Sequence, residues 1–188
     1  VKDMLYAVLG SQFNTVRTKE NQNNEIGVAL TLLSADAHTE FLLVEMGMRK
    51  KNDLTYLAKL VQPDYVIFTG VGKSHIGLHG SFRELASAKA EIFRKTLKWQ
   101  LNTRYCFMSS NGAFFDSMKK RAETAGYKLI TYTGNDKVSE NINLIYSFGS
   151  FLGVSEPKIQ EGLTGFEASS HRMKIHYKNG VTILDDSY

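Results

Sequence analysis

The sequence has a single cysteine, Cys106, among its 188 residues. One cysteine excludes an internal disulfide and a zinc site built from several cysteines. Cys106 lies in the apolar run RYCFM, which favours a buried apolar role over that of a reactive thiol. No apolar run approaches the ~20 residues that cross a membrane. The first residues, VKDMLYAVLG, have the pattern of a helix and not of a signal peptide, so we expect a cytoplasmic protein without membrane insertion.

A basic stripe interleaved with aromatic residues, the pattern typical of nucleic-acid binding, is also missing. The net charge of +4 is spread along the chain, which indicates a solvated surface and no nucleic-acid partner. What the chain does have is the composition of a soluble globular protein, with 43% hydrophobic and 22% charged residues. Its length suffices for one sizeable domain with its own core.

Apolar runs alternate with segments of helical periodicity along the chain. The predicted buried strands are Phe41–Gly47, Tyr65–Gly70, Arg104–Ser109 and Tyr127–Thr133. The predicted helices are Asn24–Ser34, Asn52–Val61, Ser81–Lys98 and Ala113–Ala125. This alternation predicts an α/β fold, in which helices cover both faces of a mostly parallel sheet. Near the C-terminus, Asn179-Gly180 separates two alternating runs and predicts a small antiparallel hairpin.

Both ends of the sequence look like cuts through a larger protein. Val1 begins inside a helical pattern with no capping residue before it, and Tyr188 ends the chain just after a predicted strand. We therefore expect this sequence to be a fragment.

The stretch FTGVGKSHIGLHG, residues 68–80, contains a Gly-Lys-Ser triplet that resembles a phosphate-binding loop. The Walker pattern requires a glycine five positions before the Gly of this triplet, so that successive backbone N–H groups surround a phosphate. That position holds Ile67, inside a predicted strand. A helix should also begin at Lys73, whereas the next helix is predicted to start near Ser81. Both requirements fail, so we interpret the triplet as a coincidence.

Ionisable side chains lie at or just beyond the carboxyl ends of predicted strands, where open parallel sheets bind their ligands. They are Glu45, His75 and the pair Asp185-Asp186. Each alone is more often a solvated surface residue. Together, a carboxylate and a histidine on neighbouring loops suit a divalent metal that carries a phosphate.

Lys89 stands out because it falls within the apolar stripe of the helix predicted over Ser81–Lys98. The stripe has i, i+3, i+4 spacing and consists of Phe82, Leu85, Ala86, Ile92, Phe93 and Leu97. The charged residues predicted on the opposite face are Arg83, Glu84, Glu91, Arg94 and Lys98. Lys89 either extends its ammonium to the edge of the stripe or has a chemical role. A partly desolvated lysine has a lowered pKa and keeps a neutral amine available to react.

Four motifs, in matching order and spacing, resemble those of the Mur ligases, the ATP-dependent amide ligases of peptidoglycan synthesis. They are NQNNEIGVALTLL, LLVEMG, VGKSHIGLHGSFRELASAKAEIF and ILDDSY. The resemblance runs from Val1 to Tyr188 and implies the central ATP-binding domain of this family, with a P-loop NTPase-like fold. It implies that this domain covers residues 1–180 and that residues 181–188 start the C-terminal ligase domain. The family's own phosphate loop would end immediately before Val1, outside this sequence.

The resemblance implies a catalytic group that holds Mg²⁺. Glu45, in VEMG, and His75, in VGKSH, match positions that hold magnesium in the family. Lys89, in SAKAEIF, matches the lysine whose carbamate joins the metal and phosphate site. A carbamate would explain the presence of a lysine in an apolar stripe.

The resemblance also implies contacts with ATP. Asn141 matches the asparagine that contacts adenine, while Arg172 and Asp186 match the arginine and aspartate that bind ATP. Helical spacing places Asn141 beside apolar residues, namely Val138, Ile145 and Leu152. Asn23 or Asn24 is expected to face the phosphate or acyl-phosphate region, and the sequence does not decide between them.

The sequence departs from the family pattern in a few places. Gly70-Val71-Gly72-Lys73-Ser74-His75 stands where the family usually has Asn-Val-Gly-Pro-Ala-His. Similarly, His171-Arg172-Met173 replaces a Gly-Arg-Met form. Between Thr133 and Val138 the family normally carries a further sheet segment, and here only GNDK intervenes. Either this member lacks the segment or the sequence has been closed over a gap.

The motif forms favour the family members that add D-alanyl-D-alanine to UDP-N-acetylmuramoyl-tripeptide. In the implied reaction, ATP converts the tripeptide carboxylate to an acyl phosphate, and the amine of D-alanyl-D-alanine then displaces phosphate. The resemblance thus implies ATP and Mg²⁺ as cofactors. It also implies a cytoplasmic monomer that serves cell-wall synthesis, cell shape and cell division.

Two alternatives remain open. The chain could come from another amide ligase of the family, of the diaminopimelate-adding or folylpolyglutamate type. It could also be a nucleotide-binding module without catalysis. Without a phosphate loop, the fragment alone is expected to be inactive.

Overall fold

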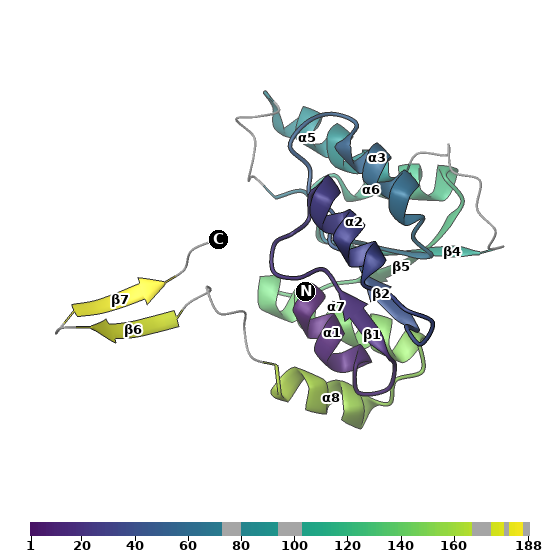
Figure 1. Ribbon diagram of the computed structural model, residues 1–188. Coiled ribbons are helices and arrows are strands. Elements are labelled where there is room, and N and C mark those ends of the chain that lie inside the picture. The colour runs from purple at the N-terminus through teal and green to yellow at the C-terminus, as the bar shows by residue number, and fades with distance from the viewer. Residues whose placement is uncertain (73–79, 94–102, 167–173, 179–180, 186–188) are drawn as a thin grey trace.

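Figure 1 shows the computed structural model of the chain, which describes residues 1–72, 80–93, 103–166, 174–178 and 181–185. The helices are α1 (Lys2–Leu9), α2 (Glu25–Leu33), α3 (Asp53–Val61), α5 (Phe82–Lys89), α6 (Phe115–Thr124), α7 (Lys137–Phe151) and α8 (Glu156–Thr164), with a 3₁₀ turn, η1, at Ala90–Phe93. The strands are β1 (Thr15–Arg17), β2 (Phe41–Leu43), β3 (Tyr65–Phe68), β4 (Arg104–Ser109), β5 (Tyr127–Tyr132), β6 (Lys174–Lys178) and β7 (Val181–Asp185).

The strands pair as the predicted α/β class requires. β3, β4 and β5 form a parallel sheet in that order, with Val66 of β3 opposite Cys106 of β4. β1 and β2 form a separate parallel pair. β6 and β7 form the predicted antiparallel hairpin, in which Ile175 lies opposite Leu184. The hairpin lies apart from the helical layers in Figure 1.

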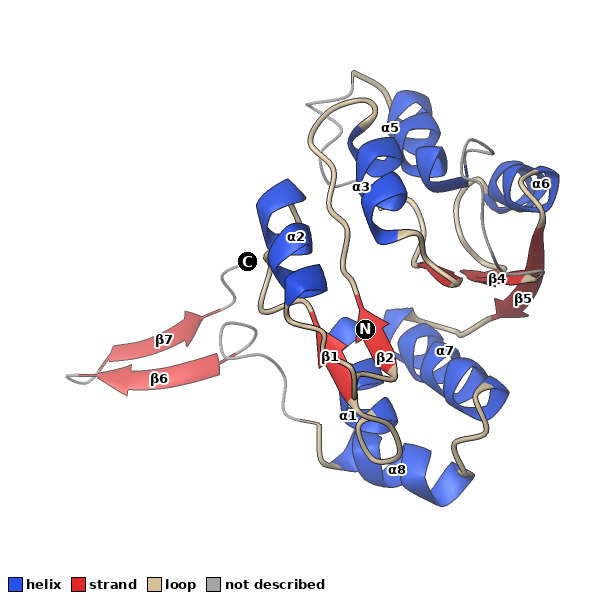
Figure 2. Cartoon of the chain, turned by 45° about the vertical axis from the view of Figure 1, so that its right-hand side comes forward, coloured by secondary structure: helices blue, strands red, loops and turns tan. Residues whose placement is uncertain are grey.

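Side chains of the central strand β4 alternate between two hydrophobic layers. Cys106 and Met108 belong to one layer, together with Leu85 of α5 and Met118 of α6. Phe107 belongs to the opposite layer, which contains residues of α1, α7 and α8. In Figure 2, α3, α5 and α6 lie on one side of the β3–β4–β5 sheet, and α1, α7 and α8 lie on the other. The predictions of a sheet covered on both faces and of a buried Cys106 are thus confirmed.

The strand predicted over Phe41–Gly47 is shorter in the structure, because the backbone beyond β2 bonds to groups other than a neighbouring strand. The N–H of Glu45 donates to the hydroxyl of Thr18 at 3.0 Å. The N–H of Gly47 donates to the carbonyl of Asn23 at 2.8 Å. The residues that follow β2 therefore form a loop, and they are half-buried where a buried strand was predicted.

The helix predicted over Ser81–Lys98 is also divided, since α5 ends at Lys89 and η1 follows. A 3₁₀ turn has about 3.0 residues per turn against about 3.6 in an α-helix, so it rotates the next side chains away from the α-helical stripe. Glu91, predicted on the solvent face, is consequently buried and accepts a hydrogen bond from the hydroxyl of Thr55 at 3.4 Å. Residues 94–98 lie outside the described part of the chain.

Helix α7 begins at Lys137, the last residue of the GNDK connection. Asp136 caps it by accepting a hydrogen bond from the N–H of Ser139 at 2.8 Å. Asn141 lies on this helix, as its spacing predicted, and Ile145 is fully buried. Val138 differs from the prediction, because it occupies the solvent-facing first turn and is 68% exposed.

Two elements were not predicted from the sequence, the short strand β1 and the helix α8. Strand β1 positions the segment that precedes α2, and α8 packs against α1 and α7. No helix within the described residues has the length and apolar character needed to cross a membrane.

Candidate functional site

The carboxyl ends of β2 and β3 open onto a cleft with a volume of about 2420 Å³. Its walls come from α1, the segment before α2, the loop after β2, the end of α5 and the first turns of α7. The predicted site residues that line this cleft are Asn23, Asn24, Glu45, Lys89 and Asn141. The remaining predicted site residues, His75, Arg172 and Asp186, lie outside the described part of the chain. Residues far apart in sequence therefore meet at one edge of the fold.

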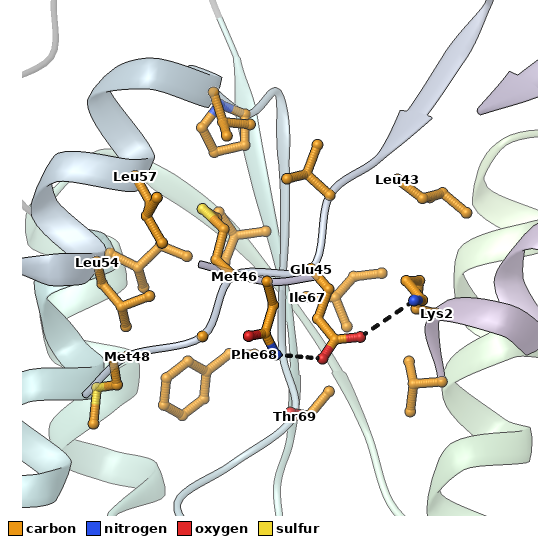
Figure 3. Close-up of a pocket in the computed structure, with 18 of the residues that line it drawn as sticks. Lys2, Leu43, Glu45, Met46, Met48, Leu54, Leu57, Ile67, Phe68 and Thr69 are labelled. Carbon is orange, nitrogen blue, oxygen red and sulfur yellow. Dashed lines mark hydrogen bonds and ion pairs between the residues drawn. The ribbon is translucent and has the colours of Figure 1, made fainter. Parts of the chain in front are cut away.

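Glu45 lies in the loop after β2, and both of its carboxylate oxygens have polar neighbours (Figure 3). Oε1 accepts a hydrogen bond from Nδ2 of Asn23 at 2.9 Å, and Oε2 lies 3.6 Å from Nζ of Lys2. Apolar side chains of the cleft, including Leu54 and Leu57, lie on the other side of Glu45 from Lys2. The Glu45 side chain is 35% exposed, so its carboxylate is held by the protein and still reaches the cleft.

Lys2, on the first turn of α1, anchors this arrangement and was not predicted as a site residue. Its Nζ donates to the backbone carbonyls of Thr18 at 2.7 Å and of Glu20. The side chain is only 9% exposed. This role has no signal in the sequence, because a lysine near the start of a helix is ordinarily a surface residue.

The neighbouring residues Asn23 and Asn24 have different local roles. Asn24 is the N-cap of α2, where its Oδ1 accepts a hydrogen bond from the N–H of Gly27 at 2.9 Å. Asn23 instead donates to Glu45. A Cβ at Gly47 would lie 2.5 Å from Oδ1 of Asn23, so glycine at position 47 permits this close approach. Of the two asparagines, Asn23 is the one that contacts the Glu45 carboxylate.

Lys89 is the last residue of α5, and its Nζ donates to the carbonyl of Gly70 at 2.9 Å. Gly70 follows β3 with φ +104°, a conformation that favours glycine. Burial lowers the pKa of Lys89, and the neighbouring Lys137 ammonium lowers this pKa further. The environment matches the predicted partly desolvated lysine, and the lowered pKa shifts its protonation toward the neutral amine.

A second polar cluster lies near Lys89 at the first turn of α7. Nζ of Lys137 donates to the carbonyl of Thr69 at 3.2 Å and pairs with Oε2 of Glu140 at 2.9 Å. Glu140 also accepts a hydrogen bond from the hydroxyl of Ser109, and this bond, with the help of Lys137, lowers the pKa of Glu140. The sequence prediction missed this cluster. Ser109 ends strand β4, so the rule that ligands bind at carboxyl strand ends could have found it.

The Gly-Lys-Ser triplet does not have the surroundings of a Walker loop. Ile67 lies within β3, and α5 starts only at Phe82, with Ser81 as its N-cap. The glycine requirement therefore fails in the described structure as well, whereas the position where a Walker helix would begin, Lys73, lies outside the described residues. Residues 73–79, which include His75, lie outside the described residues.

The chemistry around Glu45 suits a hard divalent cation, which takes oxygen ligands such as carboxylates. Across the described ranges, no group of three or more His, Cys, Asp or Glu side chains is placed to hold a metal ion. A metal site at Glu45 would therefore take its further ligands from water, from other oxygen donors such as carbonyls or a bound phosphate, from a modified side chain or from residues beyond these ranges.

Comparison with known proteins gives one family. The Mur ligase middle domain matches residues 1–165. The UDP-N-acetylmuramoyl-tripeptide--D-alanyl-D-alanine ligase of Bacillus subtilis is 28% identical over 214 residues, covering 100% of this chain and 46% of the relative. The ligase of the same name from Buchnera aphidicola is 32% identical over 221 residues, covering 100% of this chain and 49% of the relative. The chain thus spans about half the length of these relatives.

Solved structures share the fold. A crystal structure of MurF from Acinetobacter baumannii superposes with a TM-score of 0.86 at 21% identity, over 100% of this chain and 48% of that one. MurF ligase from Thermotoga maritima, in complex with ADP, superposes with a TM-score of 0.77 at 20% identity, over 100% of this chain and 50% of that one. At these identities the similarity establishes the α/β architecture.

Proposed function

Because this chain belongs to the Mur ligase family, matching its middle domain over residues 1–165, we propose that it is part of an ATP-dependent amide ligase. The proposed reaction joins D-alanyl-D-alanine to UDP-N-acetylmuramoyl-tripeptide, as the names of the relatives suggest. The observation that carries the proposal is the convergence of Asn23, Glu45, Lys89 and Asn141 in one cleft at the carboxyl ends of parallel strands. The ADP complex of the Thermotoga maritima structure supports a nucleotide ligand.

The predicted nucleotide and phosphate residues have proposed roles, apart from Asn24, which caps α2. Asn141 would contact the adenine of ATP, and Arg172 and Asp186 would bind the rest of the nucleotide. Asn23 holds Glu45 and would face the phosphate region. We keep the division into a central domain over residues 1–180 and the start of a C-terminal domain at 181–188 as part of the proposal.

The metal site would consist of Glu45, His75 and a carbamate of Lys89. Bound Mg²⁺ would supply positive charge that lets two anions, the phosphate and the attacking carboxylate, come together. Carbamate formation adds CO₂ to the neutral amine of Lys89 and releases one proton. The lowered pKa of Lys89 favours this amine, and the carbonyl of Gly70 accepts an N–H bond that a carbamate nitrogen can also donate.

The chemistry divides into two transfers. A carboxylate oxygen of the tripeptide attacks the γ-phosphorus of ATP, the bond from this phosphorus to ADP breaks, and an acyl phosphate forms. The amine of D-alanyl-D-alanine then attacks the acyl carbon, phosphate leaves, and the nitrogen loses a proton. The protein forms no covalent bond to substrate in this scheme. Its residues act by positioning the reactants and by stabilising charge.

We extend the proposal to the setting of the enzyme. Its product would serve peptidoglycan and cell-wall synthesis, and through them cell shape and division. The protein would act in the cytoplasm as a monomer. These statements rest on the family resemblance of the motifs.

The test is release of phosphate by the full natural protein with ATP, Mg²⁺ and different acceptors. We expect release that requires both UDP-N-acetylmuramoyl-tripeptide and D-alanyl-D-alanine. Release that requires diaminopimelate or glutamate instead would favour another amide ligase of the family. Nucleotide binding without phosphate release for any acceptor would favour a non-catalytic module and contradict the proposal.

A further inference from the structure

Lys2 carries a nearly buried positive charge directly beside Glu45 (Figure 3). Its hydrogen bonds to the carbonyls of Thr18, at 2.7 Å, and Glu20 are short, whereas the distance to Oε2 of Glu45 is 3.6 Å. The backbone carbonyls, and not Glu45, therefore fix the position of the ammonium. A ligand that approached Glu45 would therefore encounter the Lys2 ammonium at a fixed position.

The charges around Lys2 balance one another. Arg17 pairs with Asp3, with 3.2 Å between Nε and Oδ1. Lys2 lies 3.8 Å from Asp3 and 3.6 Å from Glu45. Two cations thus face two carboxylates, and since Arg17 is the closer partner of Asp3, Lys2 mainly balances the charge of Glu45. A carboxylate whose charge is already balanced is a weak ligand for a free divalent cation.

We propose that Lys2 makes divalent-cation binding at Glu45 depend on the nucleotide. The fixed ammonium repels a free cation, because it lies within a few ångströms of the carboxylate that would bind it. A cation accompanied by a polyphosphate brings negative charge of its own and overcomes this repulsion. Lys2 is a positioning and charge-balancing residue in this scheme, and the inference rests on the proposed function, which supplies the cation and the nucleotide.

The scheme requires that cation binding and nucleotide binding be coupled reciprocally. If the nucleotide raises the affinity for the cation, the cation raises the affinity for the nucleotide by the same factor. Removing the ammonium should strengthen binding of the free cation more than binding of the cation with nucleotide. The coupling factor should therefore shrink in a variant without the charge of Lys2.

The experiment measures binding of Mn²⁺ to the full natural protein by electron paramagnetic resonance, with and without a non-hydrolysable ATP analogue. We expect Lys2→Met to bind free Mn²⁺ at least about fivefold more tightly than the wild type and to show a smaller coupling factor. Lys2→Arg keeps the charge and should resemble the wild type. Lys19→Met removes an equal charge from an exposed neighbouring position and serves as the matched control.

Equal or weaker affinity of Lys2→Met for free Mn²⁺, including no binding by either protein, would overturn the inference. If Lys2→Met does not fold, Lys2→Gln provides the test, because its amide can still donate to the carbonyls while lacking the charge. The proposed function is judged separately by acceptor-dependent phosphate release. A protein that couples Mn²⁺ to nucleotide through Lys2 but forms no amide would refute only the proposed function.

Discussion

Lys89 connects the chemistry of the cleft with the packing of α5. It is the last residue of α5 and lies beside buried apolar residues. Its amine donates a hydrogen bond to the carbonyl of Gly70, just beyond the carboxyl end of β3. Burial lowers its pKa, since the charged form loses solvation. The lowered pKa shifts Lys89 toward the neutral amine that the proposed carbamate requires.

Replacing Lys89 tests that role. We expect Lys89→Ala to lower the turnover of the full natural enzyme at least about 100-fold, a loss typical of one missing electrostatic stabiliser. Added bicarbonate should not restore activity, because the reacting amine is gone. Arg83→Ala, an exposed cation on the same helix, is the control and should keep near-normal turnover. Near-normal turnover of Lys89→Ala would refute the carbamate.

Cys106 provides a residue-scale prediction about pH. Burial raises the pKa of its thiol to about 12, from 9.0 in an exposed thiol. Above pH 9 the unfolded chain releases this proton while the folded chain keeps it, so the free energy of unfolding should fall with rising pH by up to about 1.4 kcal/mol per pH unit.

The measurement compares denaturant unfolding of the wild type and Cys106→Val between about pH 8 and 10.5. Other groups titrate in both proteins, so the difference between the two curves isolates the thiol. The difference between the two free energies of unfolding should be constant below pH 9 and should change above it. A difference that is flat throughout would show that the thiol ionises equally in both states.

Single residues also mark the limit of prediction from the sequence. The stripe around Lys89 was visible because a lysine interrupted an apolar period. Lys2 and Glu140 interrupt no pattern, and their partners are a carbonyl and a hydroxyl from distant segments. Glu91 was misplaced because the 3₁₀ turn changes the angular step per residue. The Glu140 cluster had an indirect signal, Ser109 at the carboxyl end of β4, whereas the contacts of Lys2 and Glu91 depend on tertiary structure and leave no local signal.

At the scale of elements, the strands and helices with strong apolar periods were predicted well. β3, β4 and β5 agree with their apolar runs to within a residue or two, and α2 and α3 have the expected bounds. β2 was predicted too long, because the side chain of Thr18 bonds where a neighbouring strand would. β1 is too short to produce a clear alternation of its own.

The cap of α2 gives an element-scale prediction. Asn24→Ala removes the acceptor for the N–H of Gly27 and should lower the free energy of unfolding by about 1 kcal/mol. Asn24→Asp keeps an acceptor oxygen and should change stability by only a few tenths of that value. Hydrogen exchange of the Gly27 amide provides the local measurement. Unchanged protection of this amide in Asn24→Ala would contradict the capping role.

At the scale of the whole molecule, parallel strands bring distant segments to one cleft. The alternation of strands and helices predicted this edge as the ligand site, because carboxyl ends of parallel strands share it. Residues of α1, of the loop before α2 and of α7 complete the cleft, and their contribution depends on how the helices pack over the sheet. The sequence therefore predicted where the site lies better than which residues build it.

The relatives also bear on the connection between β5 and α7. Alignments that cover all 188 residues of this chain extend over 214 and 221 residues, so the relatives carry additional residues within the aligned region. The family pattern predicts that additional residues of the relatives lie between Thr133 and Val138, where this chain has only GNDK. In the structure, Asp136, the third residue of GNDK, is the N-cap of α7.

The central claim is that the cleft around Glu45 and Lys89 supports ATP-dependent formation of one amide bond. The most direct measurement follows the mass of the UDP-linked product and the release of phosphate together, in the full natural protein and in Glu45→Gln. We predict one D-alanyl-D-alanine added per phosphate released by the wild type, and loss of both in the variant. The central claim would be contradicted by phosphate release without an increase in the mass of the UDP-linked product, or by full product formation by Glu45→Gln.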